Sequence, residues 1–170
     1  MGNIYAFGEL QIFDAQPSFK YLAERSLIVN FMITGFSILN VEGKIESAQS
    51  LAKQRFPKLN INIEKVEHKG EKVDINYSFL AEYMDGDSKE SKKVGSIKLE
   101  GVVEMTEGKE ASAAVIKKWD ADHMLPTNMA EELINSLNFR CSATGTLVAY
   151  SIGLIPPMVV STTKITEPKK

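Results

Sequence analysis

The sequence predicts an α+β fold: a four-stranded antiparallel sheet packed with a short helix and a long C-terminal helix, after an N-terminal extension. The first observation is a pair of segments, residues 72–83 and 94–106, joined by a polar connection that contains a glycine. In both segments apolar side chains recur at every second position, which is typical of strands with one covered face. The second observation is a stretch of about 24 residues near the C-terminus in which apolar residues recur at three- and four-residue steps, the pattern of an amphipathic helix.

Two upstream segments complete the predicted sheet. Residues 36–46 contain an alternating run, and residues 59–64 alternate between aliphatic side chains and Asn or Glu. The turn at residues 67–71 contains a glycine and has hairpin length, so it should join two neighbouring strands. The connection at residues 47–58 is long enough to be a crossover, and its Pro57 cannot donate a hydrogen bond to a strand ladder.

Two helices are predicted after the sheet. Residues 111–119 are small or straight-chained, which favours a short helix. A polar stretch ending in a proline follows, and Thr127 or Asn128 should cap the long helix; Asn128 and Glu131 have capping-box spacing. Gly153 is placed as the C-terminal cap, before two prolines that prevent continuation. At 1.5 Å per residue this helix would be roughly 36 Å long, so it needs more partner surface than one four-stranded sheet readily provides.

Composition limits the classes of function. The 170 residues suit one domain, with an N-terminal extension (1–35), a main domain (36–165) and a tail (166–170). A net charge of −2 and a pI near 5.8 argue against nucleic-acid binding by phosphate neutralisation. The longest apolar run, residues 27–39, is shorter than the ~20 residues that span a bilayer, so no stable membrane insertion is expected. Cys141 is the only cysteine, which favours a reducing, cytoplasmic location.

No catalytic constellation or nucleotide-binding loop stands out, so the sequence predicts a protein that is not an enzyme and holds no metal or cofactor. The one cluster with ligand chemistry is Asp120, Asp122 and His123, whose oxygen and nitrogen atoms could hold a divalent ion. A solvated loop in which Asp122 acts as a cap is the favoured interpretation. Cys141 lies on the apolar stripe of the long helix, where a cysteine usually behaves as a small hydrophobe.

The order of these elements resembles the SecB family of protein-export chaperones. The most specific segment is the Met-Leu-Pro step at residues 124–126 leading into residues 129–134, which is similar to the linker and helix start of that family. The Phe-Ser-Ile sequence at residues 36–38 resembles the start of the family's first strand, and the hairpin at residues 65–73 matches in length. The resemblance covers about residues 36–155.

The resemblance implies an ATP-independent holdase that binds unfolded polypeptides, for export or as a chaperone of the toxin–antitoxin type. It also implies a homotetramer built as a dimer of dimers, with an export motor as a further partner. The alternative from another class is a non-enzymatic structural or adaptor oligomer whose apolar surface serves only self-association.

In the family, clients would lie between the sheet edge, the helix linker and the long helix. We therefore expect Trp119, Met124 and Leu125 to contact clients, although Trp119 could instead anchor the short helix on the sheet. Three strand aromatics could line the groove or, as the favoured alternative, fill the core: Tyr77, Phe79 and Tyr83.

The expected subunit interface lies on the long helix, where small residues would allow two helices to approach closely. Its predicted members are Leu137, Cys141, Thr144, Gly145 and Val148.

Overall fold

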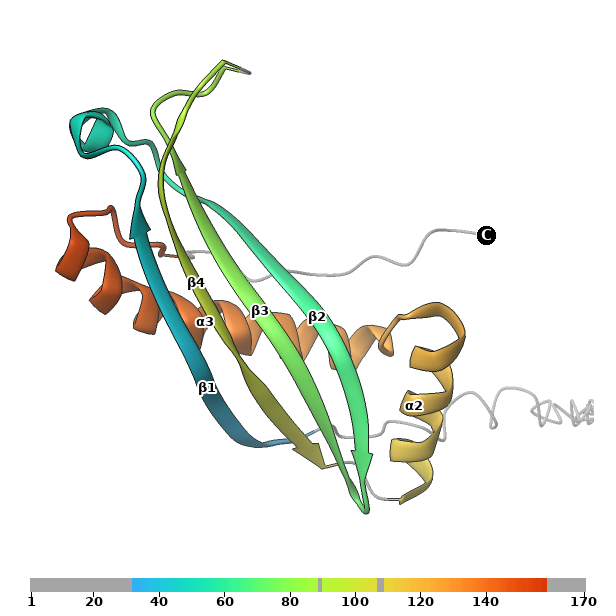
Figure 1. Cartoon of the computed structure of the whole chain (residues 1–170). Helices are drawn as coiled ribbons and strands as arrows, with labels where there is room; N and C mark the ends of the chain where they lie inside the picture. The colour runs from blue at the N-terminus through green and yellow to red at the C-terminus, as the bar shows by residue number, and fades with distance from the viewer. Residues whose placement is uncertain (1–31, 89, 107–108, 159–170) are drawn as a thin grey trace, which may run out of the picture.

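The computed structural model describes residues 32–88, 90–106 and 109–158 (Figure 1). It confirms the α+β class. One antiparallel sheet has the strand order β1-β4-β3-β2. Its strands are β1 (Met32–Ile45), β2 (Lys58–Lys69), β3 (Lys72–Met84) and β4 (Lys93–Thr106).

The connection between β1 and β2 is a crossover, as its length indicates. These two strands occupy opposite edges of the sheet, with β4 and β3 between them. The connection contains a short 3-10 helix, η1 (Ala48–Lys53). Beyond η1, the backbone N–H of Arg55 donates to the carbonyl oxygen of Met84 at 2.8 Å, which ties the crossing segment to the end of β3.

The central hairpin is antiparallel, as predicted. Val73 lies opposite Met105 and Phe79 lies opposite Leu99, so the alternating apolar residues of β3 and β4 share one face of the sheet. These four side chains are fully buried. A period of two therefore identified the core side of both central strands correctly.

The two edge strands are longer than predicted, and both contain bulges. β1 begins at Met32, four residues before the predicted start, so the last four residues of the predicted extension belong to the sheet. The register shifts between Ile38 and Asn40, which leaves Leu39 as the extra residue of a bulge. In β2 the register shifts between Ile63 and Lys65, and pairing continues to the end of the strand. At a register shift the alternation of apolar and polar side chains is interrupted, although the strand itself continues.

Two α-helices follow the sheet. α2 (Lys109–Asp122) is longer than predicted, and α3 (Thr127–Ile152) has 26 residues. Gly153 adopts the left-handed conformation at the C-terminal end of α3, with φ of 78°, as predicted. The prediction that Thr127 or Asn128 is the N-cap is wrong. The N-cap position is occupied by Pro126 in an extended conformation, so both residues lie within the first turn.

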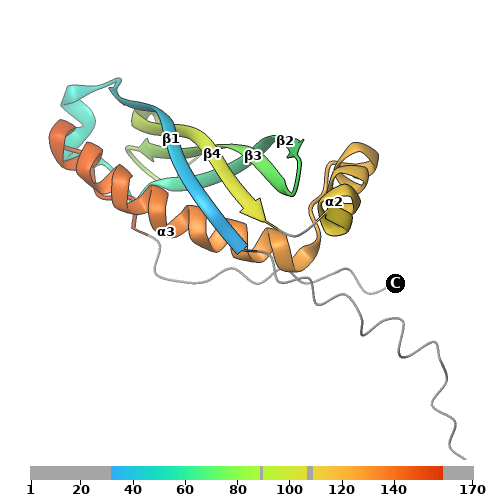
Figure 2. The ribbon, with the colours of Figure 1, turned by 90° about the horizontal axis from the view of Figure 1, so that it is seen from below.

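α3 crosses one face of the sheet, from α2 near β2 to a point beyond β1 (Figures 1 and 2). The chain that leaves α3 is held by Gln54. Its side-chain amide donates to the carbonyl oxygen of Gly153 at 2.9 Å, and its oxygen accepts from the N–H of Ile155 at 2.8 Å. The hydroxyl of Tyr83 donates to the carbonyl oxygen of Ile155 at 2.7 Å. These contacts tie the segment after α3 to the crossover and to β3.

In the parts of the chain that the structure describes, no helix is both long and apolar enough to cross a membrane. Residues 1–31 of the predicted extension and the predicted tail lie outside the described residues.

Candidate functional site

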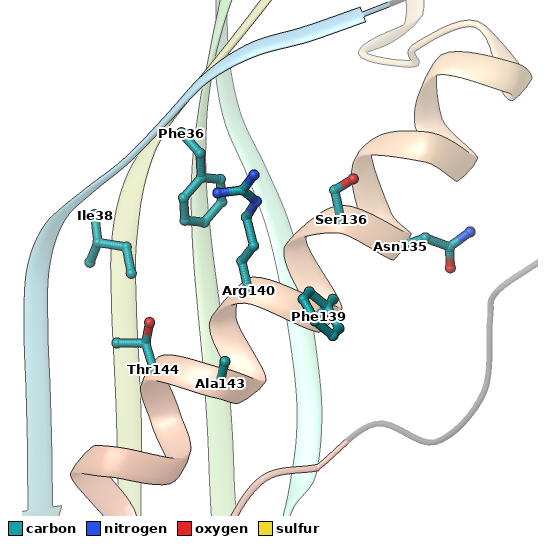
Figure 3. Close-up of a pocket in the computed structure, with 8 residues that line it drawn as sticks. All are labelled: Phe36, Ile38, Asn135, Ser136, Phe139, Arg140, Ala143 and Thr144. Atoms are coloured by element: carbon teal, nitrogen blue, oxygen red, sulfur yellow. The ribbon is translucent and has the colours of Figure 1, made fainter.

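A groove of about 990 Å³ lies between β1 and α3 (Figure 3). One wall comes from the edge strand and the other from the middle of the long helix. We call it the β1–α3 groove and define it by its lining residues: Phe36, Ile38, Asn135, Ser136, Phe139, Arg140, Ala143 and Thr144.

Phe36 forms the floor of the groove and is held from two sides. Its ring stacks on the ring of Tyr77, with 5.6 Å between centroids and 25° between planes. The guanidinium carbon of Arg140 lies 4.9 Å from the centroid of Phe36, a cation–π contact. The hydroxyl of Tyr77 donates to the carbonyl oxygen of Ser37 at 3.5 Å. The floor is therefore continuous with the core and does not depend on an occupant to hold its shape.

The two elements that line the groove also carry most of the exposed large apolar side chains. Among the described residues, nine large apolar side chains are exposed, and six of them belong to β1 or α3. Clustered exposed apolar residues are typical of interaction surfaces in soluble proteins. The six residues are Met32, Leu39 and Val41 on β1 and Phe139, Leu147 and Tyr150 on α3.

β1 is also a free sheet edge. Within the described part of the chain it pairs only with β4, so its outer side presents unpaired backbone N–H and C=O groups. After the bulge at Leu39, the pairing with β4 is regular from Asn40 to Ile45. An extended chain can add a strand to such an edge and place alternate side chains into the neighbouring groove.

The strand aromatics do not form part of this accessible surface. Tyr77, Phe79 and Tyr83 are at most 1% exposed and belong to the core. The prediction that they contact a client is therefore corrected in favour of the alternative, that they fill the core. They alternate on the core face of β3, and the ring of Tyr77 lies against the ring of Phe36.

The remaining predicted client residues lie around α2 and the linker to α3, and none of them lines the β1–α3 groove. Trp119 is half-buried against the core. Its ring makes a T-shaped contact with the ring of His123, with 5.4 Å between centroids. Leu125 is buried, whereas Met124 is 59% exposed. Of these three residues, only Met124 offers a largely free side chain to a partner.

The polar loop before α3 is organised as a turn. The carboxylate of Asp122 accepts a hydrogen bond from the N–H of Met124 at 2.9 Å, so it acts as a local cap, as expected. His123 adopts a positive φ of 54°. Over the described residues, no group of three or more His, Cys, Asp or Glu side chains is placed to hold a metal ion.

Three of the five predicted interface residues pack within their own chain, which corrects the assignment for Leu137, Cys141 and Gly145, whereas for Thr144 and Val148 it stays a prediction. Leu137, Cys141 and Gly145 are buried, and Thr144 and Val148 are half-buried. A side chain on Gly145 would come within 2.8 Å of Pro157, and one on Gly43 within 2.7 Å of Val148. Periodicity identified the apolar face of the helix correctly, but the cover of that face is the chain's own sheet and C-terminal segment.

Sequence reasoning missed the opposite face of α3. Phe139, Leu147 and Tyr150 repeat with Ala143 at steps of four, four and three residues, so they form a second stripe along the helix. A helix with apolar side chains outside its main stripe carries a signal that could have identified this face. No comparable signal marks Phe36 or Arg140.

Cys141 gives the buried face of α3 a pH dependence. Burial raises the pKa of its thiol from 9.0 to about 11, with a smaller opposing effect from the hydroxyl of Tyr77. Burial also raises the pKa of both Tyr77 and Tyr83. The neutral forms of these groups are thus favoured in the folded state.

Raising the pH from 8 to 10 should lower the free energy of unfolding. The thiol of Cys141 ionises in the unfolded chain near pH 9 but stays protonated in the folded chain until about pH 11. Above pH 9 the unfolded state therefore binds fewer protons than the folded state. The contribution of Cys141 to the free energy of unfolding is fully present below pH 8 and is lost as the pH rises above 9. Urea unfolding between pH 7 and 9.5 measures this slope. The Cys141→Ala variant should show a shallower slope in that range, and an unchanged slope would contradict the assignment to Cys141.

No protein-family model matches the sequence, and no curated protein matches it. Among solved structures, one similar chain is a SecB-like chaperone of Mycobacterium tuberculosis in complex with a ChAD peptide from the HigA1 antitoxin. The two chains are 13% identical, the match covers 88% of this chain and 96% of the other, and the TM-score is 0.48. At this level of similarity, the function has to be argued from the groove itself.

Proposed function

We propose that this protein is an ATP-independent holdase that binds unfolded polypeptide in the β1–α3 groove. A client segment adds to the free edge of β1 through backbone hydrogen bonds and places alternate apolar side chains against Phe139 and Phe36. The backbone contacts are independent of sequence, and the groove selects for apolar segments, so many unfolded chains qualify. The proposal includes the cytoplasmic location expected from the sequence.

One observation carries the proposal: among the described residues the outer edge of β1 has no strand partner, and the β1–α3 groove runs along this same strand. Either feature alone would suit many proteins. Together they match both requirements of an extended apolar chain, which must satisfy its backbone groups and cover its side chains.

The test compares two exposed aromatic residues of α3. Phe139 is 78% exposed and lines the groove, whereas Tyr150 is 72% exposed and lies outside it. The Phe139→Ser variant should need about tenfold more protein for half-suppression of aggregation of a chemically unfolded, slow-folding client without ATP, equivalent to about 1.4 kcal/mol. The Tyr150→Ser variant should stay within about twofold of the wild type. Equal suppression by both variants and the wild type would rule out the groove as the client site.

The exposed stripe of α3 supports a second candidate, a homo-oligomer that uses this apolar surface for self-association. Leu147 and Tyr150 lie beyond the groove, near the end of α3, and are available to another copy even when a client is bound. If the surface served self-association alone, Tyr150→Ser would reduce the native mass and no variant would change client aggregation. The homotetramer built as a dimer of dimers and the export motor as a partner belong to the holdase proposal.

A further inference from the structure

The chain turns back after α3, and residues 154–158 return along the helix (Figure 1). We call these five residues the strap. Leu154 and Pro157 of the strap are buried. A β-carbon on Gly145 would lie 2.8 Å from the Cγ atom of Pro157, so the strap rests on α3 at a position where the helix has no side chain. A larger residue at position 145 would fill this seat.

The strap and the β1–α3 groove lie on opposite flanks of α3. Arg140 lines the groove, and Gly145 meets the strap. At 3.6 residues per turn, Gly145 lies about 140° around the helix axis from Arg140, with the buried Cys141 between them at about 100°. The seat of the strap is therefore separate from the groove in which we place the client.

The strap is held by its backbone. Both main-chain polar groups of Ile155 bond to side chains from elsewhere in the fold: the N–H donates to the Oε1 atom of Gln54 at 2.8 Å, and the carbonyl oxygen accepts from the hydroxyl of Tyr83 at 2.7 Å. The side-chain amide of Gln54 also donates to the carbonyl oxygen of Gly153 at 2.9 Å. None of these bonds uses a side chain of the strap, so the same donors and acceptors suit an extended segment of another sequence.

We propose that the strap occupies a peptide-binding site of its own chain, and that an extended apolar segment of an unfolded polypeptide takes its place when the strap lifts. Gln54 and Tyr83 bind the main chain of the occupant, and Gly145 leaves room for one of its side chains. The strap is then an autoinhibitory contact. The inference goes beyond the holdase proposal, because it concerns the other flank of α3 and requires no client in the β1–α3 groove.

Two observations favour a strap that lifts. Ser142 lies one turn before Gly145 on the same side of α3 and is 7% exposed, yet its hydroxyl has no hydrogen-bond partner among the described residues. Covering an unpaired hydroxyl costs free energy that water restores when the cover is removed. The strap also contains Pro156 and Pro157, which have no N–H to donate to a strand ladder. It is therefore seated without becoming part of the sheet.

The first test offers the site a free, fluorescently labelled peptide with the sequence of residues 153–158. In the full-length wild type the attached strap competes at an effective concentration in the millimolar range, so the peptide should bind poorly. Replacing Leu154 and Ile155 by Asp should lift the strap, because both side chains are wholly or partly buried. Fluorescence anisotropy should then show binding at least tenfold tighter. Met158→Asp is the matched control: Met158 is 59% exposed, and this variant should stay within twofold of the wild type.

Gln54 identifies the place where the peptide binds. Adding Gln54→Ala to the strap-lifted variant should weaken peptide binding at least fivefold, because two hydrogen bonds to the main chain of the peptide are lost. Equal binding by the wild type and the strap-lifted variant would overturn the inference. Binding that survives Gln54→Ala would also overturn it. If that binding were lost with Phe139→Ser, the peptide would lie in the β1–α3 groove and the holdase proposal would stand.

A second measurement uses the unmodified chain. If the strap lifts while the rest of the protein stays folded, the amide of Ile155 exchanges its hydrogen through local opening. We expect this amide to exchange at least a hundredfold faster than that of Cys141 in the middle of α3, after correction for intrinsic rates, with little response to low urea. Equal rates with equal urea dependence would show that the strap leaves only on global unfolding and would overturn the inference. This outcome is independent of any client.

Discussion

Replacement of Leu137 by alanine should lower the free energy of unfolding by about 2–5 kcal/mol and leave the native mass unchanged. Leu137 lies in the middle of α3 and is fully buried in the core of its own chain. Removing its three terminal carbons costs the transfer free energy of those atoms and leaves a cavity between the helix and the sheet. Urea denaturation measures the first effect, and native mass spectrometry measures the second.

Leu147 supplies the matched control on the same helix. Its side chain is 70% exposed, so the Leu147→Ala variant should lose less than about 0.5 kcal/mol. If Leu137→Ala instead reduced the native mass while stability was kept, Leu137 would belong to a subunit interface and the arrangement of α3 on the sheet would be wrong.

The Gly101→Ala variant should lose about 3 kcal/mol or more, or fail to fold. A β-carbon on Gly101 would lie 2.0 Å from the backbone carbonyl oxygen of Ser37 and 2.7 Å from the hydroxyl of Tyr77. The first contact is with backbone, so β1 and β4 would have to separate at the point where Phe36 and Ile38 enter the groove. Overpacking a core usually costs 1–3 kcal/mol, and displacement of a strand exceeds that range.

Gly35 on the adjacent strand is the control for the same substitution. The three heavy atoms nearest to a β-carbon there would be the Cβ, Cγ and Cδ atoms of Glu104, at 3.1–3.2 Å. None of the three is a backbone atom and all lie more than 1 Å farther away than the Ser37 oxygen from Gly101, so Gly35→Ala should cost only about 1 kcal/mol. Circular dichroism and chemical denaturation of both variants test the difference. Similar losses at the two positions would show that β1 does not approach β4 as closely as described.

Most of the fold followed from local pattern. The central strands β3 and β4, the crossover before β2 and the end of α3 at Gly153 were predictable, because each depends on consecutive residues. The bulges in β1 and β2 were not. A bulge such as that at Leu39 forms where two paired strands differ in length, so it depends on residues about 60 positions further along the chain.

The candidate site was less predictable than the fold. Phe36 and Arg140 meet across the groove although they are about a hundred residues apart. Phe139 lies outside the main apolar stripe of α3, so a periodicity argument assigns it to solvent. The client residues predicted from the linker do not line this groove, because α2 lies beside the N-terminal end of α3 near β2, whereas the groove lies between the middle of α3 and β1 (Figure 1).

By itself, the sequence determined the type of each main element, the buried side of the central strands and the place where the long helix ends. These depend on side-chain period and on capping residues, which neighbouring positions encode. Only the tertiary structure decided which of the two apolar faces of α3 is covered. Both faces carry apolar side chains, so the pattern alone does not distinguish them. The way in which the helix crosses the sheet decides which face is covered and which is exposed to water. The same crossing left Phe139 beside a free strand edge and buried Leu137.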